Sequence, residues 1–289
     1  MACVHCGGDA FRDRQRIAGH AVRDCRACGL TQLDPMPPRA LLDELYGDEY
    51  FESGDAGVGY GDYASQEEEY RATFADDVRR IRQFADGGRL LEVGCGFGFF
   101  LAEASAAGFD AWGVDASERA VRESAARLPG RVFRGAVGDV PELASQRFDV
   151  IFAAHLIEHI SEPRPFLADL VSRLAPGGHL VLVTPNVASW LARLSGRRWV
   201  SFKIPEHVVF YAPDTMRALL EGCGLSVRAV DPAYQFYRLP FLMSRVRELV
   251  RPLDRLIPPF ERWRPFRGRM LRVTSGSLRV IARKPDRAP

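Results

Sequence analysis

Two groups of residues in this sequence have the types and the spacing of metal ligands. The first thirty residues contain two CxxC pairs that are separated by eighteen residues. The second group lies in the stretch AAHLIEHIS, where His155, Glu158 and His159 form an HxxEH pattern. HxxEH is the signature of inverted zinc metalloproteases, and a glutamate beside two histidines can activate a metal-bound water. The sequence therefore raises two separate hypotheses, a structural metal site and a zinc hydrolase.

The two CxxC pairs predict a closed zinc site. Their spacing falls within the range of four-thiolate zinc modules, and each pair is followed by a glycine, Gly7 or Gly29. A glycine with positive φ lets backbone amides turn back toward the thiolate sulfurs. Two disulfides are the alternative, but the start MACVHCGG lacks a secretory signal, which favours zinc. Because four thiolates leave no open position, we expect a structural ion. The expected ligands are Cys3, Cys6, Cys25 and Cys28.

Composition predicts a soluble globular protein with one enzyme-sized core and a small additional module. The chain has 289 residues, of which 47% are hydrophobic and 26% charged. A formal net charge of +2 gives no reason to expect a polyanionic partner. No run approaches eighteen uninterrupted apolar residues, so we expect a cytoplasmic protein.

A glycine-rich turn separates a predicted strand from a predicted helix. The stretch RLLEVGCGFGFF contains an apolar strand that ends at Val93 and a GxGxG turn with Gly94, Gly96 and Gly98. Missing side chains allow a ligand to approach the backbone and the start of the helix. The next strand ends at Asp115, whose carboxylate can accept hydrogen bonds from both ribose hydroxyls of a nucleotide-type cofactor.

Strands and helices alternate along the rest of the chain. Predicted helices lie at 66–84 and 117–128, and predicted strands lie at 131–136, 148–154 and 179–186. Repeated alternation of this kind predicts a doubly wound, Rossmann-like α/β fold with a mainly parallel sheet.

Taken together, these motifs resemble class I S-adenosylmethionine-dependent methyltransferases over residues 66–230. LLEVGCGFG is similar to the first motif of that family, GDV at 138–140 to its adenine-contacting turn, FDVIFAAHLIEHI to its fourth-strand motif and LAPGGHLVLVTPN to its fifth. The general likeness is to the ubiquinone O-methyltransferase type. The resemblance implies S-adenosylmethionine as cofactor and the following cofactor-binding residues: Glu92, Gly94, Cys95, Gly96, Gly98, Asp115, Ala116, Asp139, Val140 and Ala154.

The resemblance also argues against two other functions. HxxEH begins where the apolar strand 150–154 ends, and in the resembled family EH after this strand binds no metal, so Glu158 and His159 are expected to be helix-start and packing residues. A dinucleotide site is disfavoured because Glu92 would repel a pyrophosphate and because the turn is GxGxG instead of GxGxxG. The same carboxylate suits a cationic ligand without phosphate.

Two histidines are candidate catalytic residues. The sulfonium of adenosylmethionine is already a good leaving group, so positioning provides most of the catalysis, and a hydroxyl acceptor needs in addition a base near neutrality. His155 follows the fourth strand, where the methyl group is expected to point, although a capping or packing role is an equal alternative. His207, in the segment FKIPEHVVFY, resembles a PEH segment that faces the acceptor in the family.

The sequence divides into a zinc ribbon at 1–34, a linker with an aromatic lid segment at 35–65 and a class I methyltransferase domain at 66–289. Within this domain, 232–275 forms a basic amphipathic insertion that interrupts the last two strands. Such a segment could cover the acceptor pocket, clamp an acidic acceptor or lie on an anionic membrane surface, which would place the protein at the inner membrane face.

We expect an enzyme that transfers methyl to a small-molecule or glycan-type acceptor, which could be lipid-linked, at an oxygen atom. An RNA methyltransferase is one alternative, but the ribbon has a balanced charge and no basic-aromatic stripe, so nucleic acid is not expected as a partner. A non-catalytic nucleotide-binding protein with a zinc-ribbon interaction module is the other alternative.

Overall fold

The computed structural model describes residues 2–38, 41, 66–239, 241–242 and 269–286. Within these residues no helix is long and apolar enough to cross a membrane. The predicted aromatic lid within 42–65 and the central part of the predicted insertion, 243–268, lie outside the described residues.

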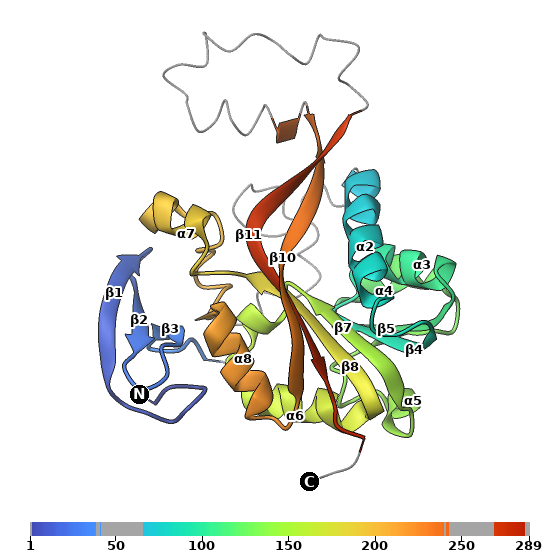
Figure 1. Ribbon diagram of the computed structural model, residues 1–289, viewed down its shortest axis with the longest axis horizontal. Coiled ribbons are helices and arrows are strands. Elements are labelled where there is room, and N and C mark those ends of the chain that lie inside the picture. The colour runs from blue at the N-terminus through green and yellow to red at the C-terminus, as the bar shows by residue number, and fades with distance from the viewer. Residues whose placement is uncertain (1, 39–40, 42–65, 240, 243–268, 287–289) are drawn as a thin grey trace.

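A seven-stranded sheet forms the body of the protein, in the order β10-β11-β8-β7-β4-β5-β6 (Figure 1). Strands β4 to β8 are parallel to one another, whereas β11 pairs antiparallel with β8 and forms an antiparallel hairpin with β10 at the edge of the sheet. The strand order reverses at β4, which lies between β5 and β7, so ligands are expected at the carboxyl ends of these strands. The strands are β4 (Gly88–Val93), β5 (Phe109–Asp115), β6 (Val132–Arg134), β7 (Phe148–Ala154), β8 (Leu174–Pro185), β10 (Ser226–Arg238) and β11 (Met270–Arg283).

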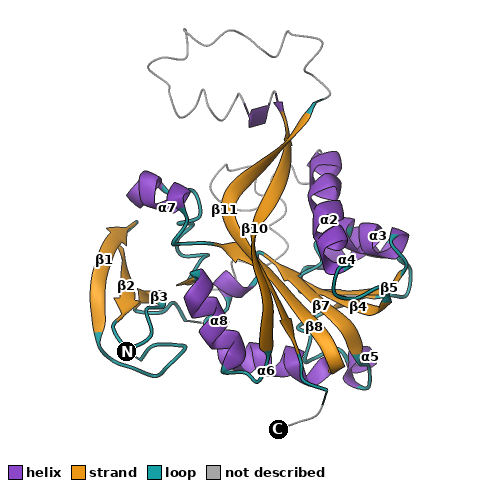
Figure 2. Ribbon diagram, viewed as in Figure 1, coloured by secondary structure: helices purple, strands orange, loops and turns teal. Residues whose placement is uncertain are grey.

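Helices cover both faces of this sheet, as Figure 2 shows. One hydrophobic core contains residues of the first two helices of the body, and a second contains Leu143, Leu167, Leu170 and Leu219 from helices on the other face. This two-sided cover confirms the predicted doubly wound α/β class. The helices are α2 (Glu67–Ile81), α3 (Phe99–Ala106), α4 (Glu118–Ala125), α5 (Pro141–Ala144), α6 (Pro163–Arg173), α7 (Trp190–Ser195) and α8 (Pro213–Glu221), with 3₁₀ turns η3 (Ile157–His159) and η4 (Gly196–Arg198).

The hairpin β10–β11 extends further than the sequence indicated. Pairing continues from Ala233 opposite Ser277 to Arg238 opposite Met270, so the expected limits 232–275 of the insertion are too wide. The alternating aromatic residues Tyr234 and Phe236 suit a strand, and the amide of Phe236 donates to Thr73 Oγ1 of α2 at 3.0 Å. The helix therefore supports the part of the hairpin that rises out of the sheet in Figure 2.

The N-terminal residues form a second, four-stranded sheet. Its strands are β1 (Phe11–Ile17), β2 (His20–Cys25), β3 (Thr31–Asp34) and β9 (Val209–Phe210), in that order. The last of these strands belongs to the body, and it pairs antiparallel with β3. The ribbon is therefore joined to the body through a shared sheet.

A buried ion pair connects α2 to the last strand. Arg279 on β11 donates to Asp77 at 2.6 Å and to Asp76 at 3.1 Å, and all three residues are buried. Burial raises the pKa of Asp77 to about 6, although the charge of Arg279 opposes this shift. The helix that precedes the glycine turn is thus held to the sheet by a charge contact as well as by apolar packing.

Replacing Arg279 is expected to destabilise the fold much more than replacing an exposed arginine. The substitution Arg279→Met would leave Asp77 buried without its cation, which costs about 3–5 kcal/mol of unfolding free energy. Arg134, whose ion pair with Glu118 is more than half exposed, provides the control Arg134→Met, with an expected cost of about 0–1 kcal/mol. Urea unfolding measures both values. Equal losses would show that the buried ion pair does not stabilise this contact.

Candidate functional site

The glycine turn lies between β4 and α3 at the carboxyl edge of the sheet. Gly94, Gly96 and Gly98 all have positive φ, at 76°, 49° and 76°. Gly98 has an additional packing requirement, since a Cβ at this position would lie 2.8 Å from Cβ of Ser124 on α4. Gly94 is exposed, so its backbone is open to a ligand. The turn therefore has the positive-φ conformation that the sequence predicted, with its exposed backbone at Gly94, and its contact with a cofactor stays a prediction.

Asp115 braces this turn from the end of β5. Its carboxylate accepts the amide of Gly96 at 2.9 Å and the amide of Ser117, also at 2.9 Å. Burial raises the pKa of Asp115, although these backbone hydrogen bonds oppose the shift. Its remaining acceptor positions are suited to the ribose hydroxyls of a cofactor. Asp115 thus has a structural role that the sequence did not indicate, in addition to its predicted role in binding.

Glu92 is a buried carboxyl group directly before the glycine turn. It is 3% exposed, and its Oε2 has no hydrogen-bond partner among the described residues. Burial raises its pKa well above the ordinary value, and the charges of Asp115 and Asp77 raise it further. A cationic group bound here would favour the ionised carboxylate and provide the missing partner. The residue therefore fits the sulfonium and ammonium charges of S-adenosylmethionine.

The other predicted cofactor residues lie along the same edge of the sheet. Ala116 and Asp139 are exposed after β5 and β6, and Ala154 ends β7. Cys95 and Val140 are buried, so their predicted contact would be made through backbone atoms or by packing. The structure brings these residues to the carboxyl ends of β4 to β7, and their contact with the cofactor stays a prediction.

His155 has an unusual backbone conformation at the end of β7. Its φ is +53°, a left-handed conformation that is uncommon for residues other than glycine. Its amide donates to the carbonyl of Val183 on β8 at 2.7 Å, and its side chain is 30% exposed. Nδ1 lies 3.4 Å from Oε1 of Glu158. This strained, partly exposed histidine is therefore placed next to a buried carboxylate at the edge where the cofactor residues gather.

Glu158, His159 and His207 form a buried group behind His155. Their ligand-type atoms all lie within 4.8 Å of one another, and the two imidazole rings meet edge to face at 4.6 Å. Nδ1 of His159 lies 3.0 Å from the carbonyl of Glu206, and Nδ1 of His207 lies 2.7 Å from that of Ser201. The group therefore has the donor types of a two-histidine, one-carboxylate metal site.

Charge within this group is set mainly by burial. Burial lowers the pKa of His159 and lowers that of His207 to about 3, so both rings are neutral near neutral pH. Burial opposes ionisation of Glu158, but the hydrogen-bonding contact with His155 outweighs it, and the pKa of Glu158 falls to about 2. Thr184 Oγ1 also donates to Glu158 at 2.9 Å. His207 is therefore a neutral packing partner of His159, and its predicted role as a base has less support than that of His155.

The HxxEH pattern does not form a metalloprotease site. Glu158 and His159 belong to the short turn η3, and they are buried as packing residues. His155 is not one of the three residues whose ligand atoms cluster within the described part of the chain. The sequence did not reveal that His207, 48 positions after His159, completes this group. The only signal was the apolar run VVF after His207, which marks a short strand.

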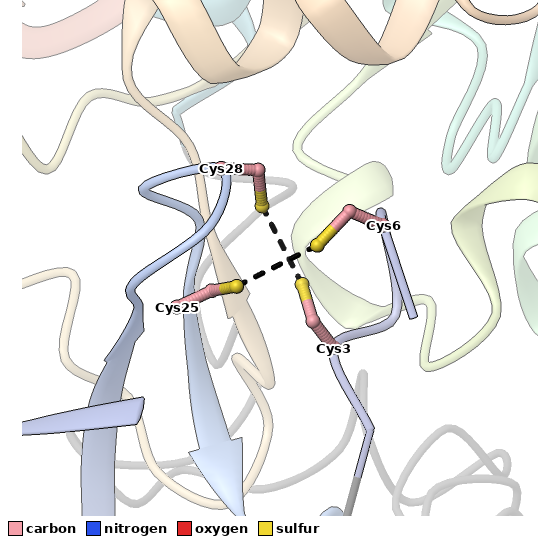
Figure 3. Close-up of side chains that lie close together, drawn as sticks. All are labelled: Cys3, Cys6, Cys25 and Cys28. Carbon is pink, nitrogen blue, oxygen red and sulfur yellow. Dashed lines mark hydrogen bonds between the residues drawn. The ribbon is translucent and has the colours of Figure 1, made fainter. Parts of the chain in front are cut away.

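The four cysteines lie together in the ribbon, as Figure 3 shows. Sγ of Cys3 lies 3.6 Å from Sγ of Cys28, and Sγ of Cys6 lies 3.6 Å from Sγ of Cys25. A tetrahedral zinc with bonds of about 2.3 Å needs sulfurs about 3.8 Å apart, so the cluster fits such an ion. Burial raises the pKa of Cys25, but the amides of Cys28 and Ala27 outweigh it and lower the pKa to about 7. At Cys25 the amides therefore favour the thiolate, whereas burial raises the pKa of Cys3 and of Cys28.

Comparison with known proteins identifies the body of the chain. A family model described as a methyltransferase domain matches residues 66–230. The chain belongs to this family. The predicted resemblance to S-adenosylmethionine-dependent methyltransferases is therefore confirmed, over the same residues that carry the motifs.

Relatives of this methyltransferase include enzymes named for ubiquinone biosynthesis. A ubiquinone biosynthesis O-methyltransferase from Caulobacter sp. (strain K31) is 32% identical over 150 residues, which are 47% of this chain and 59% of the relative. One from Cereibacter sphaeroides (strain ATCC 17029 / ATH 2.4.9) is 29% identical over 174 residues, 57% of this chain and 69% of the relative. The chain thus spans about half to two thirds of the length of the curated relatives that it matches.

Solved structures show the same fold at low sequence identity. The structure of the Haloferax volcanii Trm112 methyltransferase activator with a putative methyltransferase matches with a TM-score of 0.55 and 17% identity, covering 78% of this chain and 93% of the other. Magnesium protoporphyrin IX methyltransferase from Synechocystis PCC 6803 with bound SAH matches with a TM-score of 0.51 and 14% identity, covering 86% and 100%. These likenesses concern the fold alone.

Substitution of two glycines of this methyltransferase tests the role of the glycine turn in cofactor binding. Gly98→Ala is expected to weaken adenosylhomocysteine binding and to lower stability, because Ala adds both left-handed strain and a clash with Ser124. Gly130 has a similar φ of +72° and nothing within 4 Å of an added Cβ, so Gly130→Ala is expected to cost only about 1–2 kcal/mol of strain. Calorimetric titration and urea unfolding measure both effects. Equal affinities for the two variants would contradict the assigned role of the turn.

Proposed function

We propose that the chain is an S-adenosylmethionine-dependent methyltransferase that methylates a hydroxyl group of a small-molecule acceptor. The observation that carries this proposal is the partly exposed His155, held in a left-handed conformation at the edge that also contains Glu92, Asp115 and the glycine turn. A histidine at that position can act as a general base for an oxygen acceptor. The names of the ubiquinone biosynthesis O-methyltransferases support the same reaction class.

The proposed reaction is a single in-line displacement. S-adenosylmethionine, when bound, supplies an activated methyl group on its sulfonium and leaves as the neutral thioether S-adenosylhomocysteine. The acceptor oxygen forms the new bond to the methyl carbon, and its proton passes to Nε2 of His155. Glu158, which faces Nδ1 of His155, stabilises the imidazolium that results. Glu92 and Asp115 bind the donor, and the backbone of the glycine turn determines its orientation.

A groove beyond β8 supports a small acceptor with a ring. It has a volume of about 310 Å³ and includes Asn186, Trp190 and Tyr234 among the residues that line it. Asn186 directly follows β8, the neighbour of the strand that precedes His155. The aromatic rings of Trp190 and Tyr234 can stack on a phenolic or glycan ring, and the Tyr234 hydroxyl and the Asn186 amide can form hydrogen bonds with it.

A lipid-linked acceptor and peripheral membrane contact belong to the same proposal. The basic and apolar composition of the sequence between β10 and β11 supports them, and so do the exposed apolar residues Trp190 and Leu194 beside the arginines of η4. Co-sedimentation with anionic and with neutral vesicles tests this part. Absence of binding to anionic vesicles at low salt would remove membrane contact from the proposal.

Two other functions have weaker support. An RNA substrate would need basic groups on the ribbon, and three of its five arginines are already in ion pairs, because Arg12 and Arg14 pair with Asp24 and Arg23 pairs with Asp13 and Asp34. Salt-sensitive binding to total RNA would favour this alternative. A non-catalytic nucleotide-binding protein would bind adenosylhomocysteine without producing it from adenosylmethionine with any acceptor.

Replacing His155 is expected to separate catalysis from cofactor binding. His155→Asn removes the base, so turnover with a panel of catechols, phenols and sugars should fall by about 10²–10⁴-fold. Affinity for adenosylhomocysteine should stay close to that of the wild type. His179, which lies at the opposite end of the sheet near Phe84, provides the control His179→Asn, with unchanged turnover. Full activity of His155→Asn would exclude this residue as the base.

A further inference from the structure

The four-cysteine ribbon is built into the acceptor side of the catalytic body. Strand β3 of the ribbon pairs with β9 of the body through Thr31 opposite Phe210 and Gln32 opposite Val209. The amide of Leu33 extends this pairing by donating to the carbonyl of Val208 at 2.9 Å. Strand β9 therefore has its neighbour in the ribbon, because it does not belong to the seven-stranded sheet.

Both cysteine pairs are connected directly to β3. The second pair, Cys25 and Cys28, lies between the end of β2 and Thr31, the first residue of β3. The first pair is connected through the fully buried Gln32, whose Oε1 accepts the amide of Val4 at 3.0 Å. An ion that holds the four sulfurs together would therefore fix the position of β3 from both sides.

The residues around β9 are connected to the site by ring contacts and backbone hydrogen bonds. His207, two residues before β9, packs its ring against that of His159. The amide of Val208 donates to the carbonyl of Glu158 at 2.9 Å, and Glu158 in turn faces His155. At the other end of the strand, the carbonyl of Tyr211 accepts the amide of Val187, just beyond β8. The position of β9 thus affects the carboxylate that orients the proposed base.

Burial shows that this face of the ribbon is already occupied by the body. Leu30 and Leu33 are fully buried, and Thr31 is 2% exposed. Leu30 and Leu33 belong to the same hydrophobic core as Val208 and Phe210 of the body. Strand β3 therefore has no free face for a partner, and the ribbon is better suited to a role inside the enzyme than to docking.

We propose that the metal-loaded ribbon is a positioning element of the active site. Through the pairing of β3 with β9 it holds residues 206–211 against Glu158, so methyl transfer depends on the ribbon metal although that metal contacts neither donor nor acceptor. This inference rests on the proposed function for its catalytic part. Its structural part, the dependence of β9 on the ribbon metal, does not.

Hydrogen exchange on the full chain, with and without zinc, tests the proposal. Metal is removed with a chelator and then restored, and exchange is followed at the amides of Leu33, Val208 and Val187. We expect metal removal to accelerate exchange at these amides by about tenfold or more, because local opening of the β3–β9 pairing becomes easier. The amides of β4 and β5 should keep their protection, and adenosylhomocysteine affinity should change by less than about twofold. Turnover should fall and should recover when zinc is restored.

A matched pair of cysteine variants repeats the test without a chelator. Cys28→Ser removes one ligand of the cluster and should reproduce the accelerated exchange. Cys223, which is likewise partly buried but lies outside the cluster, provides the control Cys223→Ser, with wild-type exchange and zinc content. If Cys28→Ser does not fold, the chelation experiment on the wild-type chain decides.

Three results would overturn the proposal. Unchanged exchange at Leu33 and Val208 in zinc-free protein would show that β9 does not need the metal. Unchanged turnover with accelerated exchange would show that β9 does not support catalysis. Loss of protection in β4 and β5 together with loss of adenosylhomocysteine binding would show that the metal supports the whole fold. Failure of zinc-loaded protein to bind adenosylhomocysteine would instead contradict the proposed function, whereas the exchange result would stand.

Discussion

The half of the site that is suited to the methyl donor, at the carboxyl edge of the sheet, depends on one constraint, the burial of negative charge. Burial raises the pKa of Glu92, Asp115 and Asp77, and the charges of Asp115 and Asp77 raise the pKa of Glu92 further. Arg279 compensates Asp77, and backbone amides compensate Asp115 in part. Glu92 is left with a buried oxygen that has no partner among the described residues. A cationic ligand without phosphate relieves this imbalance, whereas a dinucleotide would increase it.

The half of the site that we propose for the methyl acceptor, formed by the residues around His155, is held in place by different contacts. Its residues lie on η3 and on the segment around β9, which do not belong to the parallel sheet. Short segments of this kind have few backbone hydrogen bonds of their own, so they need a neighbour to fix them. The ribbon provides that neighbour through β3, and buried hydrogen bonds to Glu206 and Ser201 orient the two imidazole rings. We therefore expect the two halves of the site to lose their order independently.

Local signals explain which parts of this architecture could be predicted from the sequence. The glycine turn, Asp115 and the parallel strands are each encoded within a few neighbouring residues, by apolar runs and by glycines with positive φ. The ion pair between Asp77 and Arg279 joins residues 202 positions apart, and no local pattern indicates it. The pairing of β3 with β9 is similarly remote, and the two-residue length of β9 gives almost no periodic signal. The length of the hairpin was underestimated because the arginines of its strands and the prolines of the sequence between them obscured the alternation of aromatic residues.

The HxxEH pattern shows how the backbone decides the chemistry of a motif. In a continuous helix His155 and His159 would lie on one face, four residues apart, and both could bind one metal. Here the strand β7 ends at Ala154, and the left-handed conformation of His155 turns the chain before η3 begins. His159 consequently packs against His207 in the interior, while His155 stays partly exposed at the edge. Glu158 contacts His155 at 3.4 Å and lies within 4.8 Å of the ligand atoms of His159, so a single carboxylate connects the buried histidines to the histidine that we propose as the base.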